Sequence, residues 1–133
     1  MNARLRALVR QRAENRCEYC GLRQEHAPLF GFHIDHITPK KHGGSEDPLN
    51  LALACNSCNL HKGPNLTGID PSSGEIVALF DPRNETWESH FQRRGSSILG
   101  LTSTGRVTVQ VLNMNDRENL DLRAELIAQG EID

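Results

Sequence analysis

Aromatic residues are scarce in this chain, making up 5% of its 133 residues, with a single tryptophan and a single tyrosine. A chain of this length can bury a modest core as one domain, but few large side chains are present to fill it. We therefore expect a bound metal ion or a partner to supplement the core.

Long apolar runs and a strong charge excess are also missing. No hydrophobic run approaches the length of a membrane-spanning helix, and charges throughout residues 1–16 argue against a signal peptide. The net charge is −2 and the isoelectric point about 6.3, so any contact with nucleic acid must come from a local basic patch. We expect a soluble, cytoplasmic protein with no membrane partner.

The four cysteines form two C-x-x-C pairs, Cys17 with Cys20 and Cys55 with Cys58. Disulfides are rare in a reducing compartment, whereas two such pairs have the spacing of a Cys₄ zinc site. No thioredoxin-like βαβ pattern surrounds either pair, which makes thiol redox chemistry the weaker alternative. The sequence therefore predicts a structural Zn²⁺ ion held by all four cysteines.

Periodicity and breaker residues predict the order strand, loop, strand, helix around the cysteine pairs. Pro39 ends the first strand because proline lacks an N–H, and Gly63 lies where a helix C-terminal glycine belongs. The predicted elements are a helix over 2–15, a strand over about 31–37, a loop over 40–48, a strand over 50–54 and a helix over 55–62.

The remaining half is less sharply patterned. Residues 106–112 are β-branched and fit a strand, but a helix capped by Thr102 or Ser103 fits equally well. The other predicted elements are strands over 74–80 and 98–101, and a final helix over 116–129 with a capping-box-like start at Asn115 and Glu118.

Asp35, His36 and Asn59 have the side chains that metal-assisted phosphodiester hydrolysis needs. Neutral His36 can take a proton from water as a general base. A divalent cation held by Asp35, with the Asn59 amide oxygen as a second ligand, can bind the phosphate and the leaving oxygen. A carboxylate and an amide oxygen are hard ligands, which favour Mg²⁺ or Mn²⁺.

Neighbouring side chains in a regular strand point to opposite faces. Asp35 and His36 can therefore serve one phosphate only if the strand bends or ends near them. Lys40, Lys41 and His42 form a basic loop beside this point, and Lys62 shares a helix face with Asn59. We predict that these four contact phosphate; the alternatives are a solvated loop and a lysine favoured by the helix dipole.

The motifs occur together and in order: Cys17-x-x-Cys20, Asp35-His36, Gly43-Gly44, Asn50-Leu51 and Cys55-x-x-Cys58-Asn59. Over about residues 15–65 they resemble the HNH endonuclease family, also called ββα-metal or His-Me finger nucleases. The family's last letter is usually His, and here it is Asn59. The resemblance implies that Asn50 hydrogen-bonds the loop backbone and orients His36, and that DNA is cut to 5′-phosphate and 3′-hydroxyl ends.

The predicted fold is α+β, as one HNH domain over 1–133. A small zinc-stapled ββα-metal core is flanked by an N-terminal helix and by a strand and helix extension over about 68–133. The predicted function is a Mg²⁺- or Mn²⁺-dependent DNA endonuclease, and the alternative is a non-catalytic zinc-knuckle module that binds nucleic acid. A monomer and a homodimer both stay open, and cutting both strands with one site would favour the dimer.

Overall fold

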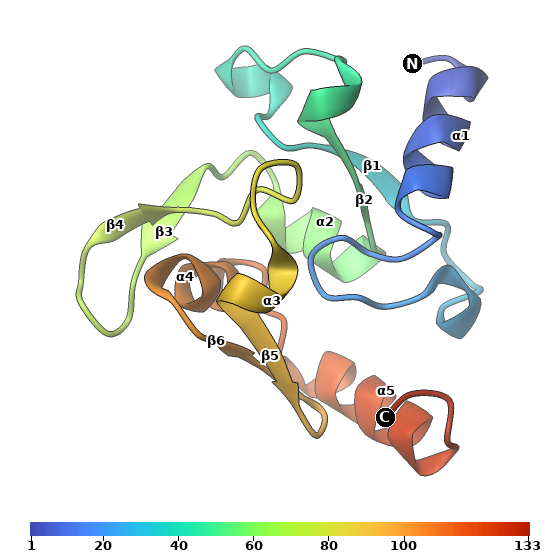
Figure 1. The fold of residues 1–133 in the computed structure, drawn as a ribbon, viewed down its shortest axis with the longest axis vertical. Helices are drawn as coiled ribbons and strands as arrows, with labels where there is room; N and C mark the ends of the chain where they lie inside the picture. The colour runs from blue at the N-terminus through green and yellow to red at the C-terminus, as the bar shows by residue number, and fades with distance from the viewer.

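The computed structural model describes residues 1–133, and it confirms the predicted α+β class (Figure 1). The strands form three separate two-stranded antiparallel sheets: β1 with β2, β3 with β4 and β5 with β6. The helices are α1 (Ala3–Arg12), α2 (Asn56–Lys62), α3 (Trp87–His90), α4 (Ser103–Val111) and α5 (Arg117–Ala128). The strands are β1 (His33–His36), β2 (Leu51–Ala54), β3 (Thr67–Ile69), β4 (Ile76–Ala78), β5 (Phe91–Arg94) and β6 (Ser97–Gly100).

The first half of the chain has the predicted order of strand, loop, strand and helix. β1 pairs with β2 in a register that sets Asp35 opposite Ala52. α1 packs on β2, and α2 packs on both strands. The arginines of α1 fix its position, because Arg10 donates to the carbonyl of Phe32 (3.1 Å) and Arg12 donates to that of Leu51 (2.6 Å).

The second half supplies two hairpins and two helices. The segment that fitted either a strand or a helix is helical, as part of α4, and the Thr102 hydroxyl caps it by accepting from the Gly105 N–H (3.1 Å). α4 packs against β3, β4 and β6. A Cβ at Gly105 would lie 2.0 Å from the carbonyl oxygen of His90, so this close approach requires glycine.

The start of α5 differs from the prediction. Its cap is Asp116, whose carboxylate accepts from the Asn119 N–H (2.8 Å), rather than Asn115. The Asn115 amide instead pairs with the backbone N–H and carbonyl of Ile98, both at 2.8 Å, and so attaches β6 to the segment before α5.

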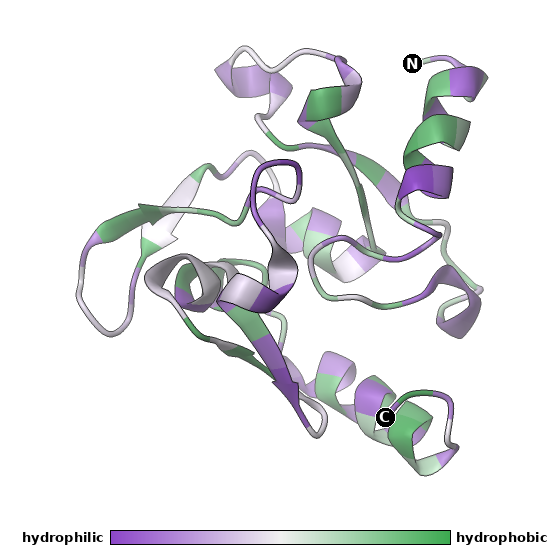
Figure 2. Cartoon of the chain, in the orientation of Figure 1, coloured by the Kyte–Doolittle hydropathy of each residue, from purple (hydrophilic) through white to green (hydrophobic).

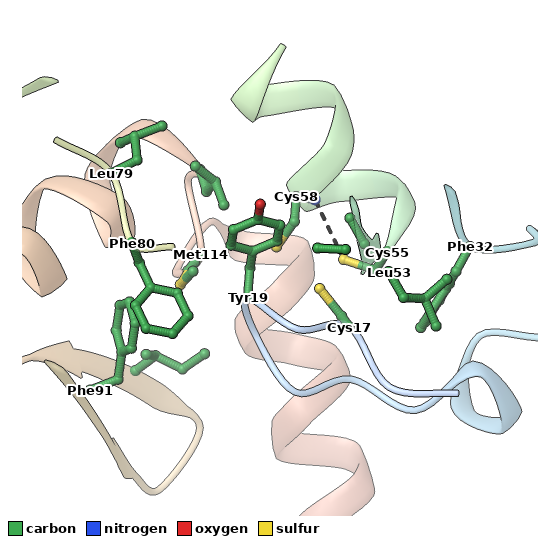
Figure 3. Packing of buried hydrophobic residues seen from close by; sticks show 14 of the residues in the cluster. Cys17, Tyr19, Phe32, Leu53, Cys55, Cys58, Leu79, Phe80, Phe91 and Met114 are labelled. Atoms are coloured by element: carbon green, nitrogen blue, oxygen red, sulfur yellow. Dashed lines mark hydrogen bonds between the residues drawn. The ribbon is translucent and has the colours of Figure 1, made fainter. Parts of the chain in front are cut away.

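One hydrophobic cluster of 17 buried residues joins the two halves. Tyr19 lies between the cysteines on one side and Phe80 and Phe91 on the other (Figure 3). Outside this core, the projecting β3–β4 hairpin carries hydrophobic residues (Figure 2), among them the exposed pair Ile69 and Ile76. No helix has the length and apolar character needed to cross a membrane.

Candidate active site

All four cysteine sulfurs lie within 4.8 Å of one another, and those of Cys17, Cys55 and Cys58 converge in Figure 3. The sulfurs of Cys20 and Cys55 are 3.7 Å apart, close to the tetrahedral edge of about 3.8 Å that follows from Zn–S bonds of about 2.3 Å. Because the four sulfurs crowd together, hydrogen bonds among the thiols hold the pKa of Cys55 well below its ordinary range and those of Cys20 and Cys58 well above it. The cluster therefore fits a structural zinc ion.

A shallow hollow of about 290 Å³ lies at the end of β1. Its lining includes the side chains predicted for chemistry, Asp35, His36 and Asn59, together with Lys40 and Lys41. β1 ends at His36, so these two neighbouring side chains need not point to opposite faces of a strand. Both line the hollow, where Asp35 is buried and His36 is half-buried.

The Asp35 carboxylate is 6% exposed and has two partners inside the protein. The Tyr19 hydroxyl donates to Oδ2 (2.6 Å), and Lys62 Nζ lies 3.3 Å from Oδ1 and 3.2 Å from Oδ2. Burial raises the pKa of Asp35, and the Lys62 charge and the Tyr19 hydrogen bond oppose this rise. A carboxylate has about four acceptor sites, so these partners leave room for a cation on the side of the hollow.

Asn59 lies on α2, one turn after Cys55, so the cysteine cluster anchors the helix that presents it. Its side-chain amide makes no hydrogen bond to the protein, in contrast to that of Asn50. An unengaged amide oxygen and the Asp35 carboxylate in one hollow form a hard donor set, which fits Mg²⁺ or Mn²⁺.

Lys62 lies differently from the prediction that it contacts phosphate. Its side chain is 2% exposed, and besides Asp35 its ammonium donates to the backbone carbonyls of His36 (3.1 Å) and Ile37 (3.2 Å). These contacts use the three donors of the ammonium and turn it away from solvent. A phosphate contact does not fit this arrangement, and Lys62 instead holds Asp35 and the end of β1 in place.

Replacing Lys62 with methionine is expected to lower the free energy of unfolding by about 3–5 kcal/mol, because the buried Asp35 carboxylate loses its counter-charge. Chemical denaturation of the zinc-loaded protein measures this loss. The exposed Lys41→Met variant is the matched control, with an expected change within about 0.5 kcal/mol. The double variant Asp35→Asn/Lys62→Met should recover most of the loss, and a Lys62→Met protein as stable as the wild type would contradict the assignment.

Asn50 does not line the hollow; its side chain holds the loop that joins β1 to β2 in place. Its amide oxygen accepts from the Thr38 N–H (2.8 Å), and its nitrogen donates to the carbonyls of Thr38 (3.0 Å) and Ser45 (2.8 Å). Gly44 packs against the same strand end, where a Cβ would lie 1.6 Å from the Thr38 carbonyl oxygen. These are contacts of the kind the resemblance implies, and their effect on His36 stays a prediction.

The basic loop is divided between the hollow and its surroundings. Lys40 and Lys41 are exposed and line the hollow. His42 is not part of the lining; its Nε2 lies 3.0 Å from the Pro64 carbonyl oxygen and so ties the loop to the segment after α2. A phosphate in the hollow would therefore meet Lys40 and Lys41. His42 instead holds the loop against the segment that follows α2.

Two residues at the site were missed by the sequence reasoning. Glu46 places Oε1 3.7 Å from His36 Nε2 and 3.1 Å from Lys40 Nζ, and the Lys40 hydrogen bond lowers the pKa of Glu46. Tyr19 reaches Asp35 from the zinc knuckle. An acid inside the basic loop and the single tyrosine between two cysteine ligands were the available signals.

The extension reaches the site through the knuckle. Trp87 Nε1 donates to the backbone carbonyl of Tyr19 (2.8 Å), and Arg83 pairs with Glu18, whose carboxylate also accepts from the Leu53 N–H (2.8 Å). The extension therefore fixes the residue whose hydroxyl holds Asp35.

Comparison with known proteins gives one family. The sequence model of the HNH endonuclease family matches residues 17–65, the stretch that contains both cysteine pairs and the lining of the hollow up to Pro64. No curated protein and no solved structure matches the chain. The family match supports nuclease activity in general.

Proposed function

We propose that this chain is a divalent-metal-dependent endonuclease that hydrolyses phosphodiester bonds in DNA, in line with the match of residues 17–65 to the HNH endonuclease family. The observation that carries the proposal is the meeting of Asp35, His36 and Asn59 in one hollow lined by two exposed lysines. A zinc module that only binds nucleic acid has no need of an acid, a histidine and an unengaged amide at the same place.

His36 acts as the general base. Its ring is half-buried at the end of β1 and faces the hollow, so a water molecule there can pass its proton to the imidazole as it attacks phosphorus. The Asn50 hydrogen bonds keep the following loop in one conformation, and this conformation sets the direction of the His36 ring.

Asp35 and Asn59 would hold the Mg²⁺ or Mn²⁺ ion. When bound, this ion supplies charge neutralisation at the phosphate and at the departing oxygen. Tyr19 and Lys62 keep the Asp35 carboxylate in place. Lys40 and Lys41 attract the DNA backbone, which gives a chain of net charge −2 a local site for nucleic acid.

We infer that residues 1–133 work as one domain. The zinc ion joins the knuckle to α2, and the extension packs on the knuckle through the shared hydrophobic cluster. The extension then has a structural role, because it holds Tyr19 beside Asp35.

Incubation with supercoiled plasmid tests the proposal. Zinc-loaded protein should convert the plasmid to open-circular or linear DNA when Mg²⁺ or Mn²⁺ is added, and should leave it intact when neither is present. Asn59→Ala should raise the metal concentration needed by roughly 10–100-fold or more, since loss of even an outer contact to a metal site has an effect of this size. Asn65→Ala, an exposed asparagine without side-chain hydrogen bonds, is the control. Absence of product with both metals, or equal cleavage without them, would sink the proposal.

A further inference from the structure

The two ring nitrogens of His36 lie in different surroundings. Nε2 is buried and has no hydrogen-bond partner at normal distance. Nδ1 is not among the buried unpaired atoms and makes no hydrogen bond, so it is the nitrogen open to solvent. A water molecule in the hollow therefore meets Nδ1, while Nε2 points into the protein.

A general base needs a lone pair on the nitrogen that meets the water. In neutral imidazole the other nitrogen then carries the proton and needs an acceptor. The Glu46 carboxylate is the acceptor on that side, with Oε1 3.7 Å from Nε2. In hydrolases with a Ser-His-Asp triad, a carboxylate behind the histidine selects the tautomer and stabilises the imidazolium that forms.

We propose that Glu46 is a positioning residue for His36: its carboxylate accepts the Nε2 proton, and Nδ1 is thereby kept free to take a proton from water. The inference rests on the proposed function of His36 as general base. This role belongs to an acidic residue in an otherwise basic loop, which contains Lys40 and Lys41.

Lys40 explains why the contact is long in the free protein. Its ammonium lies 3.1 Å from the same Oε1 and also lines the hollow where phosphate would bind. A phosphate draws Lys40 towards itself, and Oε1 is then left to His36. Catalytic hydrogen bonds are often long without substrate and shorten in the complex. DNA binding would thus complete the pair of Glu46 and His36.

The test compares Glu46→Gln and Glu46→Asp in the zinc-loaded full chain, with the exposed, unpaired Glu118→Gln as a control of equal charge change. At saturating Mn²⁺ we expect Glu46→Gln to lower kcat for plasmid cleavage roughly 10–100-fold, a part of the about 10²–10⁴-fold that a general base contributes, with little change in KM. Glu46→Asp should restore part of the rate, and Glu118→Gln should equal the wild type. Nitrogen-15 NMR of His36 should show the Nε2-protonated tautomer in the wild type and a mixture of tautomers in Glu46→Gln.

Two outcomes would overturn the inference. One is an unchanged tautomer and rate in Glu46→Gln. The other is a fall in Mn²⁺ affinity that accounts for the lost rate, since Glu46 would then be a metal ligand. The NMR readout needs no activity, so a wild type that fails to cleave would refute the proposed function while the tautomer still decides the role of Glu46.

Discussion

Removal of zinc is expected to unfold the segment that carries the active site. Structural zinc contributes about 10–16 kcal/mol of apparent binding free energy in zinc-finger peptides, as large as the 5–15 kcal/mol that stabilises a typical domain. Here the ion would join the Cys17–Cys20 knuckle to the start of α2, and three of the four cysteines that could bind it are buried. Without it, the contacts of the shared hydrophobic cluster must hold these segments together, and a chain with few aromatic residues has few large side chains for that cluster.

Circular dichroism and thermal melting of the metal-free protein measure this effect. The cooperative transition should be lost on zinc removal and should return when one equivalent of Zn²⁺ is added. Cys58→Ser should behave like the metal-free protein and should not recover with added zinc, since a hydroxyl is a poor zinc ligand. A metal-free protein that melts at the wild-type temperature would show that the cysteines are not a structural zinc site.

The order of elements around the cysteines could be predicted because its signals are local. Each C-x-x-C pair fixes a short turn, Pro39 stops a strand, and Gly63 stops α2 with a positive φ of 47°. Alternating and helical patterns then identify the elements between these stops, and the structure follows them to within a few residues.

The extension was harder to predict because packing overrides local preference there. Five of the nine residues of α4 are β-branched, yet the Thr102 cap and the close approach allowed by Gly105 place them in a helix against β6. β3 and β5 are short strands, each in a sheet of only two strands. Each forms only by pairing across a turn with the next strand, β4 or β6.

For the site, too, local sequence signals could be read in advance, whereas burial and contacts across the fold could not. The residue types and their order predicted that Asp35, His36 and Asn59 lie together, and all three line the hollow. His42 and Lys62, which were predicted to contact phosphate there, are not part of the lining. Burial could not be predicted, because a lysine near a helix C-terminus has the same pattern whether it is solvated or, like Lys62, covers a carboxylate. Contacts across the fold, such as those of Tyr19 and Glu46, depend on the fold of the knuckle and of the loop.

The second large effect is expected at His36. His36→Ala should lower the rate of DNA cleavage by about 10²–10⁴-fold, the range for loss of a general base. Its side chain makes no hydrogen bond at normal distance, so the variant should keep its zinc, its melting behaviour and its affinity for DNA. This combination separates an enzyme from a zinc module that only binds nucleic acid, because the module has no rate to lose.

The most direct measurement is therefore the single-turnover rate of plasmid cleavage by zinc-loaded wild type and His36→Ala at saturating Mn²⁺ and equal occupancy of DNA. We predict rapid cleavage by the wild type and a loss of at least about 10²-fold in the variant. Equal rates in the two proteins would contradict His36 as the base.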